Sequence, residues 1–476
     1  MRQTKRVITQ FCFYDRTGIE KMLEKQAQKG WMLESIGQLS WNYRRIEPKQ
    51  VHFAVTYYPN ASMFDPKPTV GEEMYQEFVA HSGWRFVASN AQMQIFYTEE
   101  ENPVPIETDP LVEVENIHKA VKKSFLPGYY IMLAAATLNL ILMAWRLYEN
   151  FTGTLANNAN LFTILCWLSL FGMEITEILS YYVWRRKALR AAQTDGSFVE
   201  TSNRNNMMLA ILVVVSAVLI LTLTSITPKA AYVAVVILVV MFAAVALVLL
   251  FTQWMKKTGF SREDNKAYTI LATVFISLAV TGLTTWAVAG IFDRHQEELH
   301  VRDTYEFNGM TVTKYGDDLP LTVQQLTGED DGDYSLYKTV ESSILIDRLV
   351  ANQYRKFGAG EGSSLRYVVV DVKLGILFEA CLNDYLSIYH NQQMVDVFGN
   401  EFYAEFYPTD PTAWGADRAY QLGRLGELEC EYLLVYGNRI VNIDFFDFSR
   451  KTSQDQMDMV ARILGNEQKF ENNKNK

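Results

Sequence analysis

The chain has 476 residues, 49% of them apolar, and a formal net charge of −10. No run of Lys and Arg resembles a nucleic-acid footprint, and four cysteines are too few for a disulfide scaffold, so both of these protein classes are excluded. The acidity lies in residues 293–476, which carry 18 Lys and Arg against 31 Asp and Glu. At ~150 residues per domain, the length predicts about three structural units.

Residues 1–100 predict a cytoplasmic α+β domain in which one unit, strand-helix-strand-strand, occurs twice. The first copy comprises Val7–Tyr14, Thr17–Lys29, Trp31–Ile36 and Leu39–Ile46, and the second comprises Val51–Tyr58, Gly71–Ser82, Trp84–Ser89 and Gln92–Thr98. We expect one six-stranded, mostly antiparallel sheet with both helices on one face.

A Gly-Trp pair follows each predicted helix, as Gly30-Trp31 and Gly83-Trp84. Glycine suits the left-handed turn that ends a helix. Two readings of Trp31 and Trp84 stay open: packing in the core, which buried aromatic side chains dominate, or stacking on a ligand.

These residues carry a family resemblance. Trp31, the run Phe53–Tyr58, Tyr75 and the pair Gly83-Trp84 resemble the bacterial family catalogued as domain of unknown function 2812. The resemblance implies a multi-span membrane block behind the domain. It also implies an association with PadR-like repressors and thus regulated, stress-responsive expression. The family has no assigned catalytic residues to carry over.

Residues 101–127 read as a proline-containing linker and a juxtamembrane helix, and residues 128–292 as a membrane block. Five apolar stretches there are long enough to be transmembrane helices: Gly128–Trp145, Leu161–Trp184, Met207–Ile226, Ala230–Trp254 and Tyr268–Phe292. The fold class that follows is a five-span α-helical membrane bundle flanked by two α+β domains.

The loops of this block predict its orientation. Twelve Lys and Arg fall on the side of the N-terminus and four on the other side. Because cytoplasmic loops are enriched in Lys and Arg, the N-terminus is expected in the cytoplasm and the C-terminal domain outside, in a multi-pass protein of the plasma membrane.

The second predicted span contains Glu174 and Glu177, three residues apart and therefore on one helix face. Acidic residues at membrane depth face a bundle interior and mark pathways or relays. They either bridge helices as polar contacts, with partners such as Asn139 of the first span, or bind a cation or relay protons.

Residues 293–466 predict an acidic, extracytoplasmic α+β domain, and residues 467–476 a disordered tail. Ser342–Arg355 fits a helix or a long strand equally well. Cys381 and Cys430 either pair in a disulfide outside the cell or remain buried thiols.

The sequence has no His-Glu-x-x-His motif and no nucleophile elbow, so we expect no catalytic residues, metal or cofactor. The function expected is a non-enzymatic sensor or regulatory adaptor that couples the extracytoplasmic domain to a cytoplasmic partner. The expected partners are the lipid bilayer and unidentified proteins, without nucleic acid. The alternatives are a small transporter or export subunit using Glu174 and Glu177 as an ion or proton site, and an envelope enzyme.

Overall fold

The computed structural model describes most of the chain. The described residues are 3–7, 13–37, 40–194, 196–200, 243, 246–248, 250–255, 257–276, 278–279, 282, 301–328, 334–355, 364–389, 394–395, 401–424, 427–446 and 452–466. They form two compact units: residues 1–140 with 165–286, and residues 141–164 with 287–476. The two units are described separately below.

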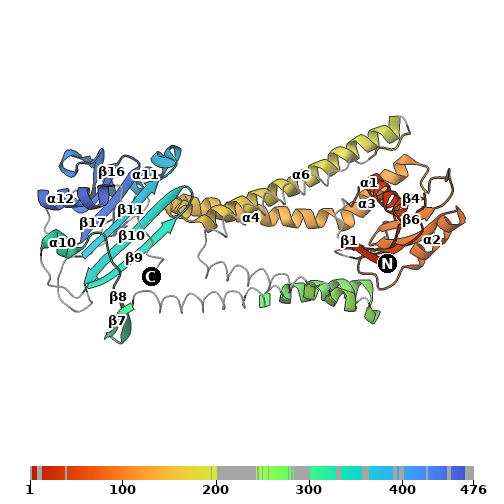
Figure 1. The fold of residues 1–476 in the computed structure, drawn as a ribbon, viewed down its shortest axis with the longest axis horizontal. Coiled ribbons are helices and arrows are strands. Elements are labelled where there is room, and N and C mark those ends of the chain that lie inside the picture. Colours follow the sequence, from red (N-terminus) through yellow and green to blue (C-terminus); the bar gives the residue numbers. More distant parts are fainter. Residues whose placement is uncertain are drawn as a thin grey trace. The chain divides into compact units, whose positions relative to one another are not determined.

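The N-terminal domain of the first unit contains the order strand-helix-strand-strand twice (Figure 1). The first copy is β1 (Thr4–Val7), α1 (Arg16–Gln28), β2 (Trp31–Ile36) and β3 (Trp41–Arg45). The second copy is β4 (His52–Tyr57), α2 (Val70–His81), β5 (Arg85–Asn90) and β6 (Met93–Thr98). The strands form two antiparallel three-stranded sheets, in the orders β1-β3-β2 and β4-β6-β5. The prediction of one continuous six-stranded sheet was therefore wrong, because each copy completes its own hydrogen-bonded sheet.

Both repeat helices begin and end at residues suited to those places. The Asp15 side chain accepts a hydrogen bond from the Gly18 amide at the start of α1, and Thr69 forms a capping box with Glu72 at the start of α2. After the helices, Gly30 and Gly83 have φ angles of +78° and +84°. This left-handed conformation lets the chain turn directly into the next strand.

The helix α3 (Pro110–Ser124) belongs to the core of this domain. Asp109 caps it and Pro110 occupies its first turn, where proline costs no hydrogen bond. Its residues Ile117 and Val121 are buried in the same cluster as Ile19 and Leu23 of α1. The segment expected to lead into the membrane is thus also a layer of the folded domain.

Two helices in the described part of the chain are long and apolar enough to cross a membrane, α4 (Leu126–Glu149) and α6 (Asn158–Thr194). At 1.5 Å per residue they are ~36 Å and ~56 Å long, against a hydrocarbon layer of roughly 30 Å. Their apolar side chains are exposed, for example Ile131 at 69% and Leu179 at 58%, unlike those of a soluble core helix. These two helices point to membrane association.

The predicted five-span bundle is not supported. The spans at 128–145 and 161–184 correspond to α4 and α6, but the described residues contain no third helix that meets the same length and hydropathy requirements. The predicted span 207–226 lies outside the described residues, as do parts of 230–254 and 268–292. The described part of the chain is instead rich in β-sheet, with a seven-stranded sheet in its C-terminal part.

The second unit is built on a seven-stranded antiparallel sheet with the order β14-β15-β16-β17-β11-β10-β9 (Figure 1). Its strands are β9 (Tyr334–Ser342), β10 (Ile346–Arg355), β11 (Ser364–Val372), β14 (Ala404–Thr409), β15 (Arg418–Arg424), β16 (Glu427–Tyr436) and β17 (Arg439–Phe446). Smaller pairs are β7 (Val301–Phe307) with β8 (Met310–Tyr315), and β12 (Met394–Val395) with β13 (Glu401–Phe402). The ambiguous segment 342–355 is thus largely the strand β10.

Helices cover both faces of this sheet. One face packs against α10 (Val323–Thr327), the 3-10 turn Thr412–Trp414, α12 (Gln454–Val460) and the π-helical turn Ala461–Gly465. The other face packs against the 3-10 turn Gly375–Leu377, α11 (Phe378–Leu386) and α5 (Phe151–Leu155), the short helix between α4 and α6. The predicted tail 467–476 lies outside the described residues.

Candidate functional site

A largely buried charged cluster, in which Glu113 is buried and the other members are half-buried, joins the two ends of the N-terminal domain. Arg16, in the first turn of α1, donates from Nη1 to Glu113 Oε2 of α3 at 2.9 Å, and its Nε lies 3.9 Å from Glu20 Oε1. Glu20 Oε1 also accepts the Val55 amide of β4 at 2.9 Å. Glu107, in the linker before α3, faces the same guanidinium. We call Arg16, Glu20, Glu107 and Glu113 the Arg16 cluster.

The carboxyl groups of this cluster hold protons unusually well. Burial raises the pKa of Glu20 to about 7 and that of Glu113 to about 7, and in both cases Arg16 opposes the rise. Burial raises the pKa of Glu107 as well. Within the cluster, one guanidinium faces three carboxyl groups, so the arrangement can take up and release protons near neutral pH.

A cavity of about 220 Å³ lies beside the cluster, lined on one side by Arg16, Glu20 and Glu107. Phe53 and Trp84 form part of its apolar wall. The Trp84 indole donates to the Val104 carbonyl oxygen at 2.9 Å, which holds the proline-containing linker in place as the remaining wall. Any movement of the linker would therefore change both the cavity and the Arg16 cluster.

Aromatic contacts fasten the domain to the C-terminal part of α6. Tyr14 packs against Tyr181 and Trp184, with ring centroids 5.2 and 5.4 Å apart. His118 Nδ1 of α3 lies 2.7 Å from the Tyr181 hydroxyl oxygen. Tyr181 is fully buried in the core of the N-terminal domain, so this end of α6 is a structural part of that domain.

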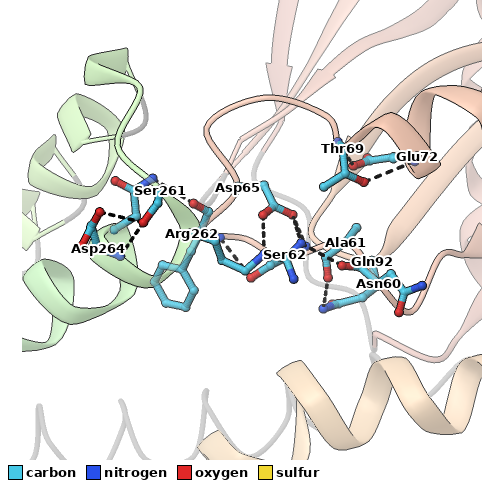
Figure 2. A network of polar contacts seen from close by, with 12 residues as sticks. Asn60, Ala61, Ser62, Asp65, Thr69, Glu72, Gln92, Ser261, Arg262 and Asp264 are labelled. Carbon is cyan, nitrogen blue, oxygen red and sulfur yellow. Dashed lines mark hydrogen bonds and ion pairs between the residues drawn. The ribbon is translucent and has the colours of Figure 1, made fainter.

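A second anchor holds the loop that precedes α2 (Figure 2). Arg262, at the start of the helical segment 262–276, forms a two-pronged ion pair with Asp65, of which Nη2–Oδ2 is 2.9 Å. Arg262 Nη2 also donates to the Asn60 carbonyl at 2.9 Å, and Asn265 Nδ2 donates to the Phe64 carbonyl at 2.9 Å. Such forked arginine–carboxylate pairs fix geometry as well as adding energy.

The same loop is held from α3. Lys123 Nζ donates to the carbonyl oxygens of Pro59 and Ala61, each at 3.2 Å. The buried Gln92 side chain donates to the same Ala61 oxygen at 2.8 Å. The loop 59–65 is therefore positioned by both α3 and the segment 262–276.

The second unit has an anchor of its own on the other ends of α4 and α6. The Asp384 carboxylate of α11 accepts the backbone amides of Phe151 and Thr152 at 3.1 and 2.8 Å. These are the first amides of α5, which lack partners within their helix, so Asp384 caps it from outside. Asn158, where α6 begins, exchanges hydrogen bonds with Ser342 and Ile344.

The sheet of the second unit also carries an acidic pair, in which Glu431 is buried and Asp444 is half-buried. Glu431 of β16 accepts the Tyr389 hydroxyl and the Asn442 amide, each at 3.0 Å, and lies opposite Asp444 of β17. Burial raises the pKa of Asp444 to about 7, and the neighbouring Glu431 adds to the rise. One carboxyl group of this pair can therefore be neutral near pH 7.

The predicted intramembrane residues lie on the two apolar helices. Glu174 and Glu177 are on α6, and Glu174 Oε2 is out of contact with solvent without a hydrogen-bond partner among the described residues. Asn139 of α4 donates to the Ala135 carbonyl of its own helix at 2.9 Å. The structure therefore gives Asn139 a local role within α4.

The two tryptophans occupy different environments. Trp84 is buried in a small cluster with Val79 and Phe96. Trp31 is half-buried, and the charged groups of Lys5 and Arg45 lie over its ring at 5.6 and 5.0 Å.

Cys381 and Cys430 do not form the disulfide that was one of their two expected states. Both are free thiols. Cys381 belongs to the cluster between the sheet and α11, whereas Cys430 packs on the opposite face of the sheet. The sheet itself separates the two sulfur atoms, which is why they do not pair.

No sequence pattern predicted the residues that form these anchors, namely Arg16, Glu113, Asp65, Arg262 and Asp384. One usable signal was present in α3, where Val114, Ile117 and Val121 form an apolar stripe beside Glu113. That stripe indicates a helix packed on a domain. Among the described residues, no group of three or more His, Cys, Asp or Glu side chains is placed to hold a metal ion.

Comparison with known proteins gives one result. Residues 15–128 match the model of the family described as "Protein of unknown function (DUF2812)". No curated protein and no solved structure matches the chain. The matched region begins at the residue that caps α1 and ends just inside α4, so it includes α3 and the whole Arg16 cluster. The N-terminal part of this chain, residues 15–128, therefore belongs to the DUF2812 family.

Proposed function

We propose that this protein is a non-enzymatic membrane sensor or regulatory adaptor, in which α4 and α6 cross a bilayer and hold a cytoplasmic DUF2812 domain at one pair of their ends and an extracytoplasmic sheet domain at the other. Since α6 returns the chain to the side of the N-terminus, this placement requires the chain to cross again, an odd number of times, between α6 and β7. The observation that carries the proposal is the set of anchors at the helix ends. The DUF2812 domain contacts the beginning of α4 and the end of α6. The sheet domain contacts α5 and the beginning of α6.

A helix whose two ends are each fixed in a folded domain can transmit a shift or rotation between them. Coupling of this kind needs an element with two states whose balance both sites bias. The Arg16 cluster is our candidate for this element, because protonation near neutral pH changes the charge that holds α3, and α3 continues into α4.

The distribution of Lys and Arg at the ends of α4 and α6 supports a cytoplasmic location for the DUF2812 domain. Lys119, Lys122 and Lys123 precede α4, and Arg185, Arg186, Lys187 and Arg190 lie in the last turns of α6. Short loops rich in Lys and Arg stay in the cytoplasm. The connection 150–157 between the two helices contains no Lys or Arg, which favours the other side.

The placement is tested by fusing a reporter that is active only in the cytosol to either end of the full-length protein. We expect signal from the N-terminal fusion and none from the C-terminal fusion. Equal signals from the two ends would rule out domains on opposite faces, and the coupling function with it. An epitope detectable from outside intact cells, fused at the C-terminus, is the complementary measurement.

One observation favours the alternative of an ion or proton pathway. Glu174 Oε2 lacks a hydrogen-bond partner among the described residues, and Glu177 lies one turn away on the same helix. Replacing both by Gln should abolish proton or cation flux in proteoliposomes if they form a pathway. Unchanged flux, or no flux in the unmodified protein, leaves the adaptor role as the sole proposal.

A further inference from the structure

An ordinary surface helix buries its apolar face and exposes its polar face. The helix α2 instead buries polar side chains and exposes an apolar row. Beside the buried Val79, its inner face carries a polar layer: Gln94 of β6 donates to the buried Glu72 carboxylate at 2.7 Å, and Gln76 donates to Gln94 at 2.9 Å. Tyr75 donates to Thr56 of β4 at 3.0 Å. This hydrogen-bonded layer fixes which side of α2 meets the sheet.

The outer face of α2 carries an apolar row. Val70, Met74 and Phe78 are spaced four residues apart and form one row along the helix. Their exposed fractions are 74%, 65% and 68%. Phe86 of the adjacent strand β5 is also exposed, at 41%, and contacts Phe96 on the side of the sheet that α2 covers.

The equivalent helix of the repeat shows that the fold does not require this arrangement. In α1 a row with the same spacing, Ile19, Leu23 and Ala27, is buried against the strands. Counted from Gly30 and Gly83, the apolar row of α2 occupies the positions of Thr17, Lys21 and Lys25 in α1, on the solvent side of the helix. Contiguous exposed apolar surface of this kind marks an interaction site.

The acidic residues beside the apolar row limit which kind of molecule can bind there. Glu73 and Glu77 form a second exposed row directly beside the apolar row. Two carboxylates beside the apolar side chains disfavour an anionic lipid surface, and pairing with a second copy would bring four carboxylates together. A helix whose apolar row is flanked by Lys and Arg complements both rows.

We propose that Val70, Met74, Phe78, Glu73 and Glu77, the α2 face, form the docking surface for a basic amphipathic helix of a partner protein. The inference rests on the proposed adaptor function, since it names the surface that the DUF2812 domain presents to its partner. The apolar row provides the buried contact and the acidic row selects the charge of the partner.

The test places a photo-crosslinking amino acid at Ala80, an exposed position of α2 that leaves all five residues intact, in the full-length protein in native membranes. The crosslinked peptide is sequenced by mass spectrometry. We expect a protein segment with an apolar row flanked by Lys and Arg. The same crosslinker at Lys25, on the exposed side of α1, serves as the matched control and should not capture that segment.

Substitutions then separate the two rows. Phe78→Ala and the double variant E73K/E77K should each lower the crosslinking yield roughly tenfold or more, as expected for residues at the centre of an interface. Exchanging the basic residues of the captured segment for Glu should restore crosslinking to E73K/E77K. All of these side chains are exposed, so the substitutions leave the core of the domain unchanged.

Crosslinking to lipid, to a second copy of this chain or to nothing would overturn the inference. So would a captured segment whose yield does not change in E73K/E77K. The reporter fusions at the two ends do not involve α2. A negative result here together with a positive reporter result would therefore remove the docking surface alone and leave the proposed function standing.

Discussion

Arg16 and Glu113 lie 97 positions apart in the sequence, yet their side chains form an ion pair with a 2.9 Å contact between Nη1 and Oε2. The Glu113 side chain is 7% exposed and that of Arg16 is 23% exposed. The pair therefore closes the DUF2812 domain by fastening its last helix to its first. Glu113 lies in the first turn of α3, and the other end of α3 leads into α4, so the pair fixes the start of the helix that leads into the first apolar helix.

Removing the guanidinium should loosen this closure. In Arg16→Met, Glu113 and Glu20 lose the positive charge that opposes the effect of burial. We therefore expect the free energy needed to open α3 from the domain to fall by about 2–3 kcal/mol at pH 8. The measurement is hydrogen exchange of the α3 amides in the full-length protein. Adding Glu113→Gln should recover most of the loss, because both partners are then neutral. Exchange in Arg16→Met equal to that of the unmodified protein would show that the ion pair does not hold α3.

The closure should also depend on pH. The pKa of both Glu20 and Glu113 is raised from 4.5 to about 7 in the folded domain, so the folded state binds protons more tightly than the unfolded state. The stabilising contribution is complete below pH 4.5 and is lost as the pH rises through 7. After correction for intrinsic exchange rates, we expect slower exchange of the α3 amides at pH 5.5 than at pH 8. Glu20 and Glu113 together should change the free energy of opening by about 3 kcal/mol between these two pH values.

Variants isolate this pH effect. The double variant Glu20→Gln with Glu113→Gln should flatten the pH dependence. Glu115→Gln changes an exposed residue of the same helix and should leave it intact. A double variant with the original pH dependence would assign the effect to other groups.

The Arg262–Asp65 pair should hold the loop 59–65. The Asp65 side chain is 9% exposed and also accepts a hydrogen bond from the Ser62 amide at 2.7 Å. This second contact holds the carboxylate in position for the ion pair with Arg262. Arg262→Lys loses the fork, and we expect faster exchange at 60–65 and a coupling energy of roughly 1 kcal/mol in a double-mutant cycle with Asp65→Ala. Glu263→Ala, at the neighbouring exposed position, is the control. A coupling energy near zero would make the pair a passive surface contact.

The cysteines give a chemical test of the sheet domain. Cys381 is buried, and burial raises the pKa of its thiol to about 11, so alkylation in the native protein should be slow. After denaturation without a reducing agent, Cys381 and Cys430 should both react fully, since both are free. Recovery of a peptide in which the two are disulfide-linked would contradict their placement on opposite faces of the sheet.

Local features of the fold could be predicted from the sequence. Gly30 and Gly83, with φ angles of +78° and +84°, mark both helix ends of the repeat, as predicted. These features depend on neighbouring residues alone. The segment 342–355 could not be assigned because its strand state comes from its neighbours β9 and β11, which pair with β10 on both sides.

The anchors could not be predicted for a related reason. Asp384 and Thr152 lie 232 positions apart, and no local pattern indicates that the carboxylate of one caps the helix of the other. The predicted count of spans rested on hydropathy alone, which measures length and composition. The contacts that distinguish α4 and α6, with each end packed in a folded domain, appear only in three dimensions.

The proposed adaptor role requires that the anchor in the sheet domain and the state of the DUF2812 domain be coupled. The most direct measurement is hydrogen exchange in full-length Asp384→Ala in lipid nanodiscs, where loss of two hydrogen bonds should release α5 at a cost of about 1–3 kcal/mol. This coupling predicts faster exchange both at α5 and at α3 and the loop 59–65, whereas Glu379→Ala on the same helix should change neither. Faster exchange at α5 with unchanged exchange at α3 and the loop 59–65 would contradict it.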